Sequence, residues 1–566
     1  MPDDAPHAVS DSTTEGLPAV ASARTTALCC SVVVAAFVCS GVAAAISGWR
    51  PSWDTAFIQM RVLDVGGRHT PLVGMPSTVS DALSTTASHP GPLHFWLLAI
   101  PNALLRWAPA GLAIAQSLIN AALAVISVLA VRTARVHDRR VGTQAVCLAT
   151  LTWLLIALLV GDEVLHDPWN PHMATIALLA ATISAIAVLL NGTRVALVSL
   201  ILSASVAAQA HLSALIPALA LVLATLLLAM QRRGWRRVRT EAITVGVTFV
   251  ACWSGPVLDQ LIHRPGNLRT LLTAGDSLGK PFGFVTGFDR LARAVTPPGL
   301  IRGGLPAVMT GGGLWIGRVV LLLFVGVAVL IVVSTRKRAA AGDRLPAATV
   351  ATVALVLAAA TWLGQSITPV TFGSVFGRHM WELMWPAAIA LWVAAGVALN
   401  ELLRRPSTAT LQPLIRLAAA PLLVPAACVF MLTVLALRSA TTDISTQRDG
   451  RWFPAIASAA NAVSTGTVEI AGITVVTNGL AIESELVAGV GADLARRGVD
   501  VAFDGPVSAG LLHPYRLRAA APASWLLFFT TFADDPLAAG SLPVSVIQSP
   551  VDPGVTIHVF LIEAQT

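Results

Sequence analysis

Long, uninterrupted apolar runs recur along most of this chain and limit its fold more than any other feature. Runs of about 20 apolar residues match the length of an α-helix that crosses the hydrocarbon core of a bilayer. Inside a bilayer a spanning segment must satisfy its own backbone hydrogen bonds, and runs of this length do so as helices. Hydrophobic residues make up 55% of the 566 residues and charged residues only 12%, whereas a soluble chain carries about 25% charged residues. The composition excludes a soluble enzyme, a disordered regulator and a fibrous repeat.

The apolar runs predict about eleven transmembrane helices. Their approximate positions are 27–47, 111–131, 142–160, 173–190, 195–208, 212–230, 242–257, 314–333, 347–363, 383–399 and 417–437. Residues 1–26 are polar and are predicted to form a disordered cytoplasmic tail. We interpret the run 27–47 as the first span rather than as a signal peptide, because no cleavage pattern follows it before Trp49.

The arginine residues predict the orientation of these helices. The chain has a formal net charge of +7, and its basic residues cluster in every second connector, at 132–140, 194, 232–239, 336–344 and 404–416. The connectors 162–172 and 209–211 contain no Lys or Arg. This alternation is a topology signal rather than a nucleic-acid footprint. We therefore expect a multi-pass protein of the cytoplasmic membrane with a cytoplasmic N-terminus, an external C-terminal region and no nucleic-acid partner.

This orientation places three large segments outside: the loops 49–109 and 258–313, and the C-terminal region 438–566. In the C-terminal region, segments rich in β-branched and aromatic residues predict strands at 473–477, 499–503, 525–531, 544–548 and 555–562, and the segment 482–497 has helical periodicity. Gly489 and Gly491 fall within that helix and complete no dinucleotide fingerprint. The predicted organisation is a transmembrane domain, 27–437, followed by an extracytoplasmic α/β domain, 438–566.

Ionisable and aromatic residues gather in the segments assigned to the outer face. The candidates are Asp54, Arg68, His69 and His89 in the first loop; Asp162, Glu163, His166, Asp167, Trp169, Asn170 and His172 in the second connector; and Arg378 and His379 before the tenth span. Ionisable groups near membrane depth are costly and therefore indicate function. A structural interpretation exists as well: Asp54 or Ser52 can cap a helix, Asp167 with Pro168 can begin one, and tryptophans anchor chains at the headgroup level.

With acidic residues in its first two outer loops, the chain resembles the GT-C superfamily of membrane glycosyltransferases, which includes mannosyl- and arabinosyltransferases. Asp54 matches the acidic residue that follows the first helix in this family, and Asp162, Glu163 or Asp167 matches the one in the next outer loop. The stretches 67–74 and 89–92 and the Trp169-Asn170-Pro171 element look like those of actinobacterial members. The resemblance covers about residues 25–440 and implies a GT-C-like fold and a polyprenyl-phosphate-linked sugar donor.

The residue types fit such a transfer. A hydroxyl group of a cell-envelope glycan, lipid or protein needs a general base, and Asp54 is the candidate. The other acidic candidates for catalysis are Asp162, Glu163 and Asp167. A lipid-phosphate leaving group needs its charge stabilised by cations. The candidates for this role are Arg68, His69, Arg378 and His379, and those for binding the sugar or acceptor are His89, Trp169, Asn170 and His172.

Other interpretations stay open at this point. His166, Asp167 and His172 are candidate ligands of a divalent cation, although their Pro-rich spacing matches no known ligand pattern. A lipid-linked sugar flippase or another transporter is an alternative function, and a non-catalytic scaffold for envelope assembly is another. Transporters tend to place ionisable residues at the bilayer midplane and to contain internal repeats. Here the polar residues cluster at one face and no repeat is evident, which favours the transferase.

Overall fold

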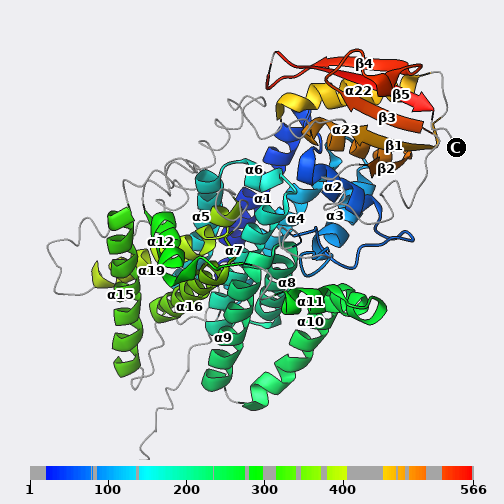
Figure 1. Ribbon diagram of the computed structural model, residues 1–566. Coiled ribbons are helices and arrows are strands. Elements are labelled where there is room, and N and C mark those ends of the chain that lie inside the picture. Colours follow the sequence, from blue (N-terminus) through cyan, green and yellow to red (C-terminus); the bar gives the residue numbers. More distant parts are fainter. Residues whose placement is uncertain are drawn as a thin grey trace, which may run out of the picture.

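The computed structural model describes residues 21–77, 80, 86–134, 139–233, 235–274, 279–296, 314–338, 346–370, 379–403, 450–466, 470–477, 484–504, 525–552 and 554–563. This part of the chain forms a bundle of long apolar helices with a small sheet domain at one end (Figure 1). Eight of the described helices are long and apolar enough to cross a membrane. The chain is a polytopic helical protein with a C-terminal sheet domain, as the sequence predicts.

Helix α7 (Asn170–Leu189) forms the centre of the bundle. Its apolar stretch is 94% buried, and it packs against α4 (Gly111–Arg132), α8 (Arg194–Ala210) and α9 (Leu215–Arg233). Ala174, Ala177 and Ala181 of α7 are fully buried, and such small side chains let neighbouring helix backbones approach closely. Helices α1 (Ala23–Ile46) and α5 (Arg139–Val160) pack on α4 and complete this part of the bundle.

The remaining long helices lie beside this centre. Helix α16 (Pro346–Ile367) packs on α9 and α19 (Trp385–Leu403), and α15 (Leu314–Arg338) packs on α16. Helices α10 (Trp235–Ile262) and α15 bury only 17% of their apolar stretches. Large apolar side chains such as Val247, Phe249 and Leu322 are exposed on them. A bilayer accounts for these surfaces, because lipid tails are as apolar as the side chains that face them.

Short helices occupy the segments between the long ones. The loop 49–109, predicted to be the first outer loop, contains α2 (Trp53–Leu63) and α3 (Leu93–Leu104), and the four-residue helix α6 (Glu163–His166) links α5 to α7. Helices α11 (Asn267–Thr273) and α12 (Gly283–Val295) follow α10, and α18 (His379–Glu382) precedes α19. Because α2, α6 and α18 each bring a polar side chain to the end of the bundle, they determine the geometry of the site described below.

The C-terminal residues form a five-stranded sheet in the order β2-β1-β3-β5-β4. The strands are β1 (Gly472–Thr477), β2 (Asp500–Asp504), β3 (Trp525–Thr530), β4 (Leu542–Gln548) and β5 (Thr556–Glu563). Strand β1 pairs in parallel with β2 and β3, and α23 (Ser484–Arg496) connects β1 to β2, which makes the predicted βαβ unit. Strand β5 pairs antiparallel with β3 and β4. A further helix, α22 (Phe453–Thr465), was not expected from the sequence.

The sheet domain packs on the first outer loop. Figure 1 shows α22 and α23 between the sheet and α2, and α23 contacts both α2 and α22. A side chain at Gly489 of α23 would collide with Ile456 of α22 and with the backbone oxygen of Pro51. Phe57 of α2 meets Phe503 of β2 with ring centroids 6.1 Å apart. One hydrophobic cluster therefore runs from α2 and α3 into the sheet.

Polar contacts reinforce this packing. The carboxylate of Asp493 on α23 is 3% exposed and lies 3.1 Å from the Arg50 guanidinium of the first loop. Arg496 and Arg497 bind the same carboxylate, each with a nitrogen–oxygen distance of 2.7 Å. Arg496 also donates to the backbone oxygen of Trp107 at the end of the loop, over 3.1 Å. The loop and the domain thus share both an apolar core and an ion network.

Most sequence expectations about the elements are met. Ten of the eleven predicted spans coincide with described helices, and the predicted strands and the helix after the first strand coincide with β1–β5 and α23. Helix α1 begins four residues earlier than predicted, at Ala23, because the Ser22 hydroxyl caps it by accepting from the Thr25 N–H. The span 417–437, the tail 1–20 and the domain boundary at 438 lie outside the described residues.

Candidate active site

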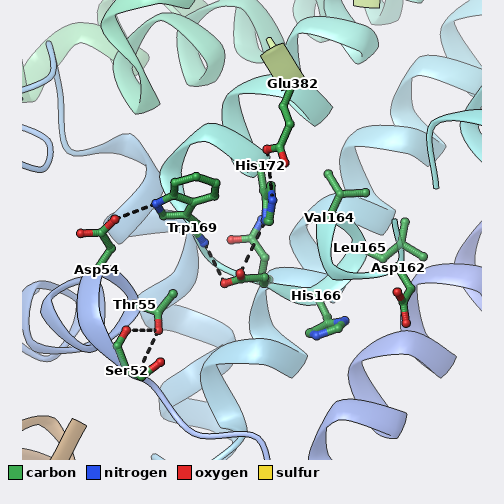
Figure 2. Close-up of polar contacts among 12 residues, drawn as sticks. Ser52, Asp54, Thr55, Asp162, Val164, Leu165, His166, Trp169, His172 and Glu382 are labelled. Atoms are coloured by element: carbon green, nitrogen blue, oxygen red, sulfur yellow. Dashed lines mark hydrogen bonds and ion pairs between the residues drawn. The ribbon is translucent and has the colours of Figure 1, made fainter. Parts of the chain in front are cut away.

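Asp54 lies in the first turn of α2, close to the end of α1. The hydrogen bonds that cap this first turn are made by Ser52 and Thr55 and do not involve Asp54. The Thr55 hydroxyl accepts from the Ser52 N–H at 2.9 Å and donates to the Ser52 backbone oxygen at 2.7 Å. The Asp54 carboxylate instead points toward the second connector, where its Oδ2 accepts from Trp169 Nε1 at 2.8 Å (Figure 2). The side chain is therefore oriented across the two loops rather than used as a helix cap.

The second connector is short and turns sharply between α5 and α7. Helix α6 ends at His166, Asp167 has extended backbone, and Pro168 and Trp169 lie outside any helix before α7 begins at Asn170. Pro171 near the start of α7 suits a helix N-terminus, because the amide it lacks has no partner within the helix there. Asp167 Oδ1 accepts from the Trp169 backbone N–H at 3.2 Å. This hydrogen bond holds the Asp167 carboxylate against the backbone of the turn.

The two acidic side chains meet in one pocket. Asp54 and Asp167 line one small pocket at the interface between the bundle and the sheet domain. The complete set of lining residues is Trp49, Ser52, Asp54, Thr55, Asp167, Trp169 and Phe453. Trp49 and Phe453 pack on each other with ring centroids 6.1 Å apart. The pocket thus combines two carboxylates with three aromatic rings, and one of the rings comes from the sheet domain.

A third acidic residue lies behind this pocket and was missed in the sequence analysis. Glu382, at the end of α18, places Oε2 3.2 Å from Nε2 of His172, while Nδ1 of the same ring lies 3.6 Å from Asp167 Oδ2. Figure 2 shows the Glu382 carboxylate directed at the His172 ring. The available signal is an acidic residue within the apolar stretch 380–385, three residues after His379 of the Arg-His pair.

Asp162 and Glu163 lie in the same connector but are not among the residues that line the pocket. Figure 2 shows Asp162 and His166 on the side of His172 away from Asp54. The Nδ1 atom of His166 lies 2.9 Å from the Ser40 hydroxyl of α1. Burial lowers the pKa of His166, while the negative charges of Asp162 and Glu163 act in the opposite direction.

The other predicted residues are distributed around the site. Arg68 and His69 are exposed on the turn after α2 and are not among the residues that line the pocket. His89 is buried, and its Nδ1 accepts from the Leu212 N–H at 3.1 Å. Asn170 donates from its side chain to the Ala210 backbone oxygen at 3.1 Å. Arg378 lies outside the described residues, as does the side chain of His379, whose backbone begins α18.

The candidate cation ligands do not converge on a common point. Asp167 faces His172, whereas His166 is turned to Ser40. Within the described ranges no group of three or more His, Cys, Asp or Glu side chains is arranged to hold a metal ion. The Asp167 carboxylate lies 3.6 Å from the His172 ring, and this contact is an ion pair when the ring is protonated.

Comparison with known proteins gives several similar solved structures, including the following two, while no family model and no curated protein matches the chain. The apo crystal structure of ArnT from Cupriavidus metallidurans has 14% sequence identity and a TM-score of 0.47, with 95% of this chain and 98% of that chain covered. The archaeal oligosaccharyltransferase AglB from Archaeoglobus fulgidus, solved with an inhibitory peptide and a dolichol-phosphate, has 12% identity and a TM-score of 0.33, with 89% and 69% covered. At these TM-scores neither similarity assigns a role to any residue of this chain.

Proposed function

We propose that this protein transfers a sugar from a polyprenyl-phosphate donor to a hydroxyl group of a cell-envelope acceptor, at the external face of the cytoplasmic membrane. The observation that carries the proposal is the pocket in which Asp54 and Asp167 lie together among Trp49, Trp169 and Phe453. Aromatic walls with a few placed polar groups are typical of small-ligand sites. Paired carboxylates are what glycosyl chemistry needs, because one group must accept a proton while positive charge develops on the sugar ring.

Asp54 is the proposed general base. It takes the proton of the acceptor hydroxyl as the hydroxyl oxygen forms a bond to C1 of the sugar. At the same time the bond between C1 and the phosphate oxygen breaks, and polyprenyl phosphate leaves with the electron pair. The Trp169 Nε1–H supports this role because it holds the Asp54 carboxylate in one orientation. Asp167 is the second acidic group at the reacting centre.

The leaving phosphate needs positive charge rather than a general acid, because a phosphate of low basicity leaves as an anion. We assign this task to Arg378 and His379, because α18, which begins at His379, packs against α7 beside the site. Arg68 and His69 are exposed on the first loop, and we expect them to contact the lipid headgroups or the incoming donor. His89 and Asn170 brace the surrounding backbone through the contacts described above.

The test uses membranes that contain the overexpressed protein, supplied with radiolabelled polyprenyl-phosphate mannose and polyprenyl-phosphate arabinose. Label transferred to envelope glycans, lipids and proteins is counted for the native chain and for Asp54→Asn. We expect Asp54→Asn to lower kcat by on the order of 10²-fold or more, because general-base catalysis contributes this much. The KM for the donor should change by less than about threefold, because the proton moves only in the transition state.

Asp64→Asn provides a matched control. Asp64 follows the opposite end of α2 and is not among the residues that line the pocket. This variant should retain native turnover. Native turnover in Asp54→Asn would show that Asp54 is not the base. Absence of transfer from both donors, combined with movement of the intact lipid-linked sugar across the membrane, would favour the flippase.

A further inference from the structure

The His172 ring joins two carboxylates from distant parts of the chain. Its Nδ1 lies 3.6 Å from Asp167 of the second connector, and its Nε2 lies 3.2 Å from Glu382, about two hundred residues later. The side chains of His172 and Glu382 are 1% and 3% exposed, and that of Asp167 is 13% exposed. Of these three side chains, Asp167 is the one that lines the pocket.

The position of Glu382 is costly for stability. It lies between Trp381 and Leu383, both buried, at the end of a four-residue helix. A buried carboxylate lowers stability unless it is paired, and an apolar side chain of similar size often serves stability as well or better. Stability alone therefore does not explain an acidic side chain at position 382. Its contact with His172 indicates a role in arranging the side chains around the pocket.

The ring of His172 also touches the residue that orients Asp54. Trp169 packs on it edge to face, with ring centroids 5.1 Å apart and an angle of 89° between the planes. Trp169 Nε1 is the atom that donates to Asp54. The contact between Glu382 and His172 is therefore connected to both pocket carboxylates, to Asp167 directly and to Asp54 through Trp169 (Figure 2).

We propose that Glu382 and His172 are positioning residues that hold Asp167 as an ion-paired carboxylate, which leaves Asp54 as the proton acceptor. The two ring nitrogens of His172 lie 3.6 Å and 3.2 Å from carboxylate oxygens, so a ring that carries a proton on each nitrogen is paired electrostatically with both carboxylates. A carboxylate paired with a cation takes up a proton less readily. Asp167 then stays negative beside the sugar ring, where positive charge develops in the transition state. This division of roles rests on the proposed function.

The first test measures turnover with radiolabelled polyprenyl-phosphate mannose and polyprenyl-phosphate arabinose. Glu382→Gln removes the charge and keeps the shape, and we expect kcat to fall by on the order of tenfold while the donor KM changes by less than about threefold. Glu382→Asp keeps the charge and should retain more activity than Glu382→Gln. In a His172→Asn background, Glu382→Gln should cause no further loss, because the connection to Asp167 is already broken.

The second test needs no substrate. Purified protein labelled with fluorotryptophan is studied by fluorine NMR, and the Trp169 resonance is the one that disappears in Trp169→Phe. We expect Glu382→Gln to shift this resonance because the His172 ring packs on Trp169. In the His172→Asn background Glu382→Gln should not shift it further. Asp259→Asn is the control, because Asp259 is another buried carboxylate paired with a histidine, His263, at 2.8 Å.

These outcomes separate the inference from the proposed function. If the fold losses in kcat of Glu382→Gln and His172→Asn multiply in the double variant, the two residues act independently and the inference is overturned. The inference is also overturned if kcat falls only in variants whose melting temperature falls, because lost stability then explains the loss of activity. If neither donor supports transfer by the native chain, the proposed function fails for these sugars. The Trp169 resonance then still reports whether Glu382 acts on Trp169 through the His172 ring. An unchanged Trp169 resonance in Glu382→Gln would overturn the inference by itself.

Discussion

At the scale of single residues, Trp169 joins the two outer segments of the site. Its side chain donates to Asp54 at 2.8 Å and its backbone donates to Asp167 at 3.2 Å. Trp169→Phe keeps an aromatic ring and removes the side-chain donor. We expect kcat to fall about tenfold, because a hydrogen bond to a charged group contributes about 1.5–3 kcal/mol. Trp96→Phe is the control, since Trp96 Nε1 donates to the Pro71 backbone oxygen outside the pocket; equal kcat values for the two variants would contradict this role.

His166 makes stability depend on pH. Its pKa is lowered in the folded chain by burial, from an ordinary value of 6.5. As the pH falls below that ordinary value, the unfolded chain binds a proton that the folded chain excludes, and stability decreases. We expect the melting temperature of the detergent-solubilised protein to fall between about pH 7 and pH 5, and to fall less in His166→Gln. The same decrease in both proteins would assign the pH dependence to other groups.

At the scale of elements, the contact between α2 and α23 depends on one buried carboxylate. Asp493→Ala would leave Arg50, Arg496 and Arg497 without the oxygen atoms that they share. Removing one member of a buried ion pair costs about 3 kcal/mol, so thermal unfolding should begin earlier, and protease should release the sheet domain more readily. Asp500→Ala changes an exposed carboxylate at the start of β2, and should behave as the native chain. Equal protease sensitivity of the two variants would show that the apolar core alone holds the domain.

Elements with a strong local pattern could be predicted from the sequence, and elements defined by contacts between distant residues could not. The strands β1 and β3 consist of β-branched and aromatic residues, so their type was evident. The Ala- and Ser-rich helix α22 has no comparable signal. Asp54 and Asp167 were found because they lie beside predicted spans. Glu382 and Phe453 reach the site through packing between segments far apart in the chain, which no local pattern reports.

At the scale of the whole molecule, the positions of the arginines predict one orientation. Helices α4, α9 and α15 end at Arg132, Arg233 and Arg338, whereas the sheet domain packs on the loop that begins after α1. A fluorescent reporter fused after Arg237 should therefore fold in the cytoplasm, and alkaline phosphatase fused after Thr566 should be active outside. Phosphatase activity at Arg237 would reverse the orientation, and fluorescence at Thr566 would indicate an odd number of missed or extra spans.

The shared core of the first loop and the sheet domain also has a consequence in time. The loop emerges from the ribosome hundreds of residues before its covering helices, and Phe57 and Phe503 must find each other across almost the whole chain. Until α22, α23 and the strands have been made, the apolar side of α2 has no cover, and the pocket lacks the ring of Phe453. Contacts of such long separation form late. A nascent chain that ends before Phe453 would therefore hold Asp54 without the complete pocket around it.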